Sequence, residues 1–183
     1  FGWHYAPHWL HRMFPGLLSS CWRGCGAVGD DLHIWWACPV LLPYWTQIAY
    51  GRKSILDFPL PFSPDKQVLG LRPAHLQLLH KQEWYTALQC LGAAKLTIAH
   101  FWKKPDCPPI TLWYQHLCAI LAMERLNSNL LGTHLLFEGK WRPVCDFLCT
   151  GLPCAMQPPR LRALVVFDGQ DQLLAVFSGW RSC

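Results

Sequence analysis

Three cysteines and a histidine lie close together near the start of the chain, within the stretch CWRGCGAVGDDLHIWWAC. The candidate metal ligands are Cys21, Cys25, His33 and Cys38. Zinc fits this set, because two thiolates from a tight turn, an imidazole and a third thiolate can complete a tetrahedron. Gly24 and Gly26 permit the positive φ angles that such a turn needs. The alternative is a chance grouping in a chain rich in both residue types, since three residues between the first two cysteines exceed the usual two.

The composition limits the class of protein. In 183 residues, 52% of them apolar, there is enough chain to bury a core without disulfides. The ten cysteines could form a secreted disulfide framework, but an apolar and helical chain favours reduced thiols, some of them holding metal. No long apolar run or secretory signal is visible, so we expect a soluble intracellular protein with no membrane partner. The net charge of +5 permits binding to nucleic acid without demonstrating it. A chain that begins at Phe1 is interpreted as part of a longer one.

The triplet Gly29-Asp30-Asp31 imitates the metal-binding turn of some polymerases. Such a turn needs flanking hydrophobic strands and a distant third carboxylate, and neither is apparent here. We therefore predict that the two aspartates form a solvated loop turn.

Prolines divide the chain into segments. Four of them fall within residues 57–73, which predicts a semi-rigid connector. Before it, residues 1–56 are expected to hold the Cys/His unit and a helix, with Pro39 and Pro43 in its first turn and Gly51 at its end. After it, residues 74–150 are expected to form a helical module, and residues 151–183 a tail of different character.

Helical periodicity marks the module. Apolar residues recur at helical spacing between positions 74 and 104, and again from Ile110 to about Asn127, with a short link that predicts antiparallel packing. A weaker segment from Phe137 to Leu148 is expected to start at or kink near Pro143. In the tail, two β-leaning runs flank a turn at 168–169. The predicted fold is mainly α: a small Cys/His unit, a short helical bundle and a candidate C-terminal β-hairpin.

Other clusters are weaker. The set His4, His8 and His11 would share a helical face, but Pro7 makes that helix doubtful and stacking on aromatic neighbours is expected. The set Cys145, Cys149 and Cys154 is interpreted as core thiols. No phosphate loop, Ser/His/Asp trio or catalytic Cys/His pair is present, so we expect no catalysis from this chain.

The order of motifs resembles a known family. Met13-Phe14-Pro15, then CWRGCG, LHIWWACP and Tyr44-Trp45, is similar to the C-terminal region of the reverse-transcriptase polyprotein of long interspersed, non-LTR retrotransposons. Further matches continue in order to Trp141 and Pro143, so the resemblance covers roughly residues 10–150. It ends near residue 150, and no reverse-transcriptase or endonuclease motif lies in the chain.

The resemblance implies a zinc knuckle that helps to hold template RNA or target DNA near an upstream reverse-transcriptase domain, in a cytoplasmic ribonucleoprotein and in the nucleus. Its ligands would be the four residues named above. Trp35 is a candidate for base stacking, while Trp36 is expected to pack beneath the metal. The candidate phosphate contacts are Arg23, Lys95, Lys103 and Lys104, with solvated surface charge as the alternative. Two further functions stay open: a protein-interaction module that docks onto the parent polymerase, and an inactive degenerate copy.

Overall fold

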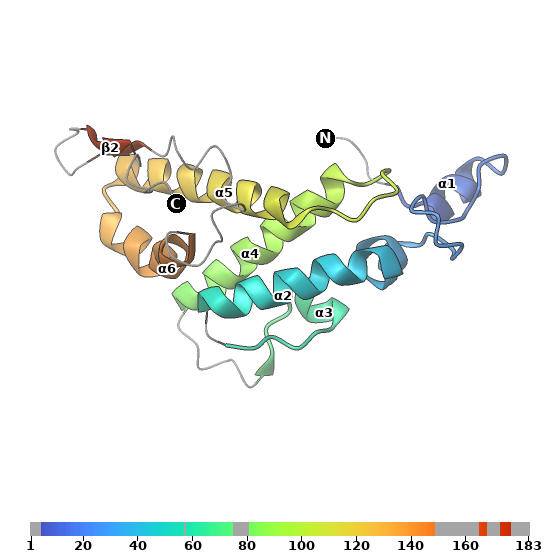
Figure 1. The fold of residues 1–183 in the computed structure, drawn as a ribbon, viewed down its shortest axis with the longest axis horizontal. Helices are drawn as coiled ribbons and strands as arrows, with labels where there is room; N and C mark the ends of the chain where they lie inside the picture. The colour runs from blue at the N-terminus through green and yellow to red at the C-terminus, as the bar shows by residue number, and fades with distance from the viewer. Residues whose placement is uncertain (1–4, 57, 75–80, 149–164, 168–172, 177–183) are drawn as a thin grey trace, which may run out of the picture.

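The computed structural model describes residues 5–56, 58–74, 81–148, 165–167 and 173–176, and this part of the chain is mainly helical (Figure 1). The Cys/His segment precedes the main helices. The α-helices are α1 (Pro7–Met13), α2 (Leu42–Leu56), α3 (Pro64–Gln67), α4 (Lys81–His100), α5 (Ile110–Leu131) and α6 (His134–Asp146). Two shorter turns, η1 (His33–Ala37, π-helical) and η2 (Pro39–Leu41, 3₁₀), lead into α2. No helix in the described ranges is long and apolar enough to cross a membrane.

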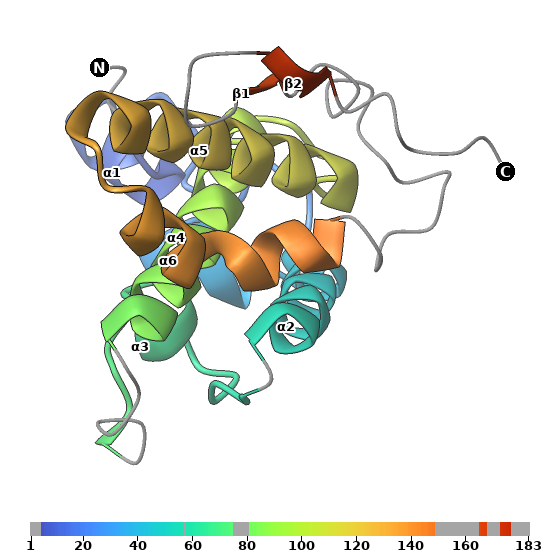
Figure 2. The ribbon, with the colours of Figure 1, turned by 90° about the vertical axis from the view of Figure 1, so that its left-hand side faces the viewer.

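Helices α4, α5 and α6 form a bundle, and α2 packs against all three of them (Figures 1 and 2). The short link after α4 reverses the chain, so that α5 is roughly antiparallel to α4, as the sequence predicts (Figure 1). Three fully buried tryptophans mark the core: Trp45, Trp113 and Trp141. Two of the buried aromatic groups have backbone partners there: Trp113 Nε1 donates to the carbonyl of Cys90 at 2.9 Å and Tyr44 Oη donates to that of Ala94 at 3.0 Å.

The prediction that Gly51 ends the second helix is wrong, because α2 continues to Leu56. Gly51 lies buried inside α2, where a Cβ atom would stand 2.9 Å from Cζ3 of Trp113. The glycine is therefore present for close approach of α5 to α2 and not for helix termination. Pro39 and Pro43 do lie at the start of the helical region, in η2 and in the first turn of α2.

The sequence predicts a helix that starts at Pro143 or kinks near it; the predicted start is wrong, and the kink stays a prediction. Helix α6 starts at His134 and runs through Pro143, which lies inside it. Its apolar face anchors it, because Phe137, Trp141 and Val144 are all buried against the core. Proline has no backbone N–H, so one helical hydrogen bond is missing at this position. Packing of the apolar face stabilises the helix despite this loss.

Helix α5 extends beyond the predicted end and stops at Leu131. Gly132 follows with φ +65°, and its N–H contacts the carbonyls of Ser128 and Asn129, which is the left-handed cap that glycine allows. Helix α4 is described from Lys81 to His100, within the predicted range of 74–104.

The proline-rich stretch 57–73 contains one short helix, α3, whose first residue is Pro64. The fully buried Gln67 donates from Nε2 to the carbonyl of Pro61 at 3.0 Å. Core residues lie on both sides of this stretch, and the domain boundary placed there stays a prediction.

Two short strands, β1 (Val165–Phe167) and β2 (Leu173–Val176), pair antiparallel with Val165 opposite Val176. The turn predicted at 168–169 and the rest of the predicted tail lie outside the described residues.

Candidate metal centre

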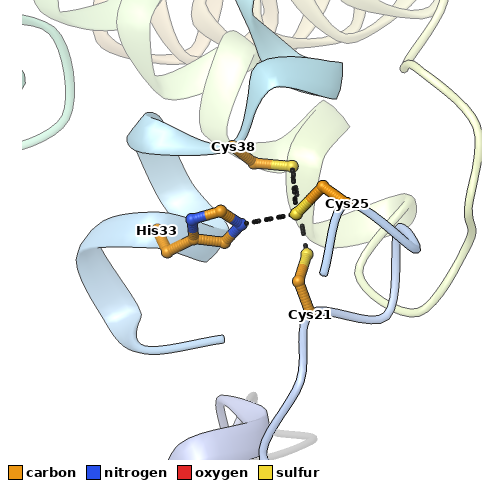
Figure 3. A group of neighbouring side chains, drawn as sticks. All are labelled: Cys21, Cys25, His33 and Cys38. Atoms are coloured by element: carbon orange, nitrogen blue, oxygen red, sulfur yellow. Dashed lines mark hydrogen bonds between the residues drawn. The ribbon is translucent and has the colours of Figure 1, made fainter. Parts of the chain in front are cut away.

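The four predicted ligand side chains converge on one point (Figure 3). The thiols of Cys21 and Cys25 come from the loop before η1, the imidazole of His33 from the first residue of η1, and the thiol of Cys38 from the residue after it. Their ligand atoms all lie within 4.8 Å of one another. Sγ of Cys21 is 3.9 Å from Sγ of Cys38, which is 4.0 Å from Sγ of Cys25, and Nε2 of His33 is 3.1 Å from Sγ of Cys25.

A narrow loop presents the first two thiols. Its ends are joined by an isolated bridge between Ser20 and Val28 and by the N–H of Cys21, which donates to the carbonyl of Ala27 at 2.9 Å. Between them, Gly24 and Gly26 adopt φ +73° and +82°. The sequence prediction that these glycines supply positive φ angles is confirmed, and the chain reverses here because no Cβ opposes it.

A capped turn presents the imidazole. The backbone N–H of His33 donates to Oδ1 of Asp30 at 2.7 Å, and the N–H of Ile34 donates to the carbonyl of Asp30 at 2.9 Å. This is the pattern of an N-cap, in which a side-chain oxygen satisfies a free N–H of the first turn. The N–H of Cys38 then donates to the carbonyl of His33 at 2.9 Å, which fixes the separation of the last two ligands.

The electrostatic surroundings differ between the two loop thiols. Burial raises the pKa of Cys21 to about 11. For Cys25, desolvation also opposes ionisation, but hydrogen bonds from the backbone N–H of Ala27 and from the neighbouring thiols outweigh it and lower the pKa. Burial is also the main cause that lowers the pKa of His33, so the imidazole is held neutral, the form in which it binds metal.

The cluster could hold a metal ion such as zinc. A tetrahedral ion with bonds of about 2.3 Å to sulfur separates its thiolates by about 3.8 Å. The two sulfur to sulfur distances, 3.9 and 4.0 Å, are close to that value. Three thiolates and one imidazole form a donor set typical of closed structural zinc sites.

Tryptophans connect the metal centre to the bundle. Nε1 of the buried Trp45 donates to the carbonyl of Trp35 at 2.9 Å. The ring of Trp102, just after α4, contacts the rings of Trp35 and Trp22 with centroids 5.0 and 6.0 Å apart. The Cys/His segment thus packs on both α2 and the end of α4.

A pocket of about 290 Å³ opens beside Cys38. Its aromatic lining consists of Trp36, Trp45 and Phe62, with ring centroids 5.3 Å apart for the two tryptophans and 4.8 Å for Trp36 and Phe62. Trp36 therefore borders an open pocket, whereas Trp35, the residue predicted to stack on a base, packs on Trp102.

The predicted phosphate contacts lie in different settings. Arg23 is 5% exposed and donates from Nη1 to the carbonyl of Ile34 at 3.0 Å, which favours a structural role over a contact to phosphate. Lys103 and Lys104 are exposed after α4, with Nζ of Lys103 5.6 Å from the centroid of the Trp22 ring. Lys95 is half-buried on α4.

Other sequence predictions have clear outcomes. The aspartate pair is exposed, as predicted for a loop turn, but it also has structural partners: Asp30 caps the turn of His33, and Oδ2 of Asp31 accepts from Nε1 of Trp9 at 2.6 Å. A short N-terminal helix, α1, begins at Pro7, a position whose N–H needs no intrahelical partner, and His4 lies outside the described residues. His8 and His11 lie on α1, and the His8 ring meets that of Trp9 edge to face.

The sequence did not predict the roles of several residues at the candidate site. The cap at Asp30 could have been found from an aspartate three residues before a ligand histidine. The burial of Arg23 and the approach of Phe62 to Trp36 depend on tertiary packing, and no local pattern indicates them. Of the predicted C-terminal thiol cluster, Cys145 is half-buried against the core, and Cys149 and Cys154 lie outside the described residues.

No known protein-family model matches the chain.

Proposed function

We propose that this chain is a zinc-binding, non-catalytic C-terminal module of a retrotransposon reverse-transcriptase polyprotein, and that it binds single-stranded nucleic acid beside its metal centre. The zinc ion would be held by Cys21, Cys25, His33 and Cys38 as part of the fold, with no role in chemistry. The observation that carries the metal proposal is the convergence of these four ligand atoms within 4.8 Å.

A surface of cationic and aromatic side chains beside the metal centre supports the nucleic-acid proposal. We call Trp22, Phe101, Lys103 and Lys104 the cation–aromatic surface. Nζ of Lys103 lies 5.6 Å from the Trp22 centroid and Nζ of Lys104 lies 4.3 Å from the Phe101 centroid. Such surfaces bind single strands because lysines neutralise phosphates while the rings stack on bases, each stack contributing roughly 1 to 3 kcal/mol.

The pocket beside Cys38 is a second candidate contact for nucleic acid. Its rim includes the partly exposed rings of Trp36 and Phe62, and its lining is apolar, as expected for a site that accepts the face of an unpaired base.

Salt titration of single-stranded RNA binding tests the proposal. The affinity of the zinc-loaded protein should fall steeply with salt, with a log-log slope of about −0.7 for each phosphate neutralised. The double variant Lys103→Met/Lys104→Met should reduce the magnitude of this slope by about 1.4. A matched control, Lys53→Met/Lys81→Met, changes exposed lysines toward the far ends of α2 and α4 and should leave the slope unchanged.

Two results would contradict the proposal. Folded and reduced protein that contains less than about half an equivalent of zinc would exclude the metal centre. Structural zinc binds so tightly that it would not be lost during purification. Zinc-loaded protein with no salt-dependent affinity for RNA or DNA would exclude nucleic-acid binding while leaving the metal centre intact. The family assignment is tested separately by the coding sequence upstream of Phe1, where an open frame with a reverse transcriptase supports it and an unrelated domain contradicts it.

Docking onto the parent polymerase is the second candidate function. Exposed apolar side chains gather where α5 ends and α6 begins. They are Met123, Leu126, Leu130, Leu131, Leu135 and Leu136, each more than half exposed. Apolar surface of this kind is typical of an interaction site. A purified upstream polymerase domain that binds the wild type, but not a Leu130→Lys/Leu135→Lys variant, would favour this function.

A further inference from the structure

Arg23 lies in the loop between the first two cysteine ligands, yet its side chain is turned inward. It is 5% exposed, and Nη1 donates to the carbonyl of Ile34 on η1 at 3.0 Å. Nε and Nη2 are buried and have no hydrogen-bond partner. An arginine stays charged at every physiological pH, so a buried guanidinium with two unpaired nitrogens is costly unless an anion compensates it.

Carboxylates do not compensate this charge in the described part of the chain. The ion pair between Lys66 and Asp65, both on α3, does not involve Arg23. Asp30, the acidic residue that caps the turn of His33, uses Oδ1 for the backbone N–H and is exposed. The counter-ion of Arg23 must therefore be sought among the groups that surround its guanidinium.

Two chain segments place Arg23 at the metal centre. It stands between the ligands Cys21 and Cys25 in the loop, and its hydrogen bond to the carbonyl of Ile34 joins it to the residue that follows the ligand His33. The ligand atoms that these segments supply all lie within 4.8 Å of one another. The ligand cluster is therefore the candidate counter-ion.

A loaded centre would carry the missing negative charge. Three thiolates, a neutral imidazole and a divalent zinc ion leave one net negative charge on the group. Because the centre is largely buried, that charge also needs compensation. A buried guanidinium with two unpartnered nitrogens and a buried centre with one net negative charge would compensate each other.

We propose that Arg23 is the counter-ion of the zinc centre, a positioning residue whose guanidinium stabilises the ligand thiolates by its charge. The inference rests on the proposed zinc site, and it assigns Arg23 to the metal and not to a nucleic-acid phosphate. Outer-shell partners of this kind typically change metal affinity by 10- to 100-fold.

The test compares variants that separate charge from packing. Arg23→Met keeps the length and apolar stem of the side chain but removes the charge, whereas Arg23→Lys keeps the charge but loses the planar fork. Zinc affinity, measured by competition with a chelator on the full chain, should fall by roughly 10- to 100-fold in Arg23→Met. Arg23→Lys should recover most of this loss. Arg12→Met, which changes an exposed arginine on α1, is the matched control and should bind zinc as the wild type does.

Cobalt substitution supplies a readout that packing alone would not move. The positive charge of Arg23 would lower the energy of the sulfur lone pairs, so the sulfur-to-cobalt charge-transfer band should shift to longer wavelength in Arg23→Met. The d–d bands should stay tetrahedral, which shows that the ligand set is intact. If Arg23→Met does not fold, Arg23→Gln, which is neutral and polar, carries the same expectation.

The outcomes separate this inference from the proposed function. A wild-type protein that takes up no zinc overturns the metal centre and the inference together. A wild type that binds zinc, with neutral variants of equal affinity and unshifted charge-transfer bands, overturns the inference alone. An Arg23→Lys variant as weak as Arg23→Met also overturns it, because the charge would then contribute nothing.

Discussion

Oδ1 of Asp30 accepts the backbone N–H of His33 at 2.7 Å, so a carboxylate that precedes the turn holds a candidate metal ligand in place. The aspartate pair therefore has a function without binding metal itself. The cap stabilises the turn whether or not the centre is loaded, since its bond is made to the backbone.

Removing this cap should weaken the metal centre. Asp30→Ala is expected to lower the free energy of unfolding by about 1 kcal/mol and to lower zinc affinity, because the N–H of His33 loses its partner. Asp30→Ser keeps a capping oxygen and should behave nearly as the wild type. Urea unfolding and chelator competition measure the two quantities. Equal zinc affinity in Asp30→Ala and Asp30→Ser would show that the cap does not position the ligand.

Two glycines inside helices should respond in opposite ways to alanine. A Cβ on Gly51 would stand 2.9 Å from the fully buried ring of Trp113, so Gly51→Ala should destabilise the protein by about 1 to 3 kcal/mol through overpacking. Gly92 in α4 has nothing within 4 Å of such a Cβ, so Gly92→Ala should stabilise by about 0.5 to 1 kcal/mol. Urea denaturation of both variants decides the matter. A stabilising Gly51→Ala would mean that α5 does not approach α2 as described.

The contrast between these glycines also shows what the sequence could predict. Helical periodicity located most of the bundle, because apolar spacing records which face is buried. It could not tell whether Gly51 ends a helix or permits a close contact, since that depends on Trp113, more than sixty positions away along the chain. The start of α6 ahead of Pro143 depends on tertiary packing in the same way, because the buried face of the helix outweighs the local effect of proline.

At the candidate site, too, some features follow from local sequence and others depend on tertiary packing. The four ligand residues could be identified from spacing, because zinc chemistry limits which residue types occur together and how far apart they stand. The environment of Arg23 could not, since a charged residue in a loop is ordinarily exposed and only the fold of η1 over it makes it buried. The partners of Trp35 and Trp36 likewise come from α2, the end of α4 and Phe62.

The thiols should differ sharply in reactivity. In metal-free, folded protein, Cys25 is expected to react with iodoacetamide before the other cysteines that the structure describes near neutral pH, because hydrogen bonds lower its pKa and its side chain is only partly buried. Cys90 and Cys118 should be spared, since burial raises the pKa of each to about 12. Peptide mass spectrometry over time gives the order of labelling. Zinc should protect Cys25, and labelling of Cys90 as fast as Cys25 would contradict the described core.

Leucines along α5 offer a test of the exposed apolar surface. Leu121 is 4% exposed and packs in the core, whereas Leu130 is 77% exposed on the same helix. Leu121→Ala should therefore cost about 2 to 5 kcal/mol by leaving a cavity, while Leu130→Ala should change the free energy of unfolding by less than about 0.5 kcal/mol. Urea denaturation measures the free energy of unfolding of both variants.

If Leu130→Ala destabilises the isolated chain as strongly as Leu121→Ala, then Leu130 belongs to the core of the chain itself and is not available to a docking partner. If it does not, the exposed leucines remain free to bury against another protein, and loss of polymerase binding in Leu130→Lys/Leu135→Lys would then measure that contact without interference from stability.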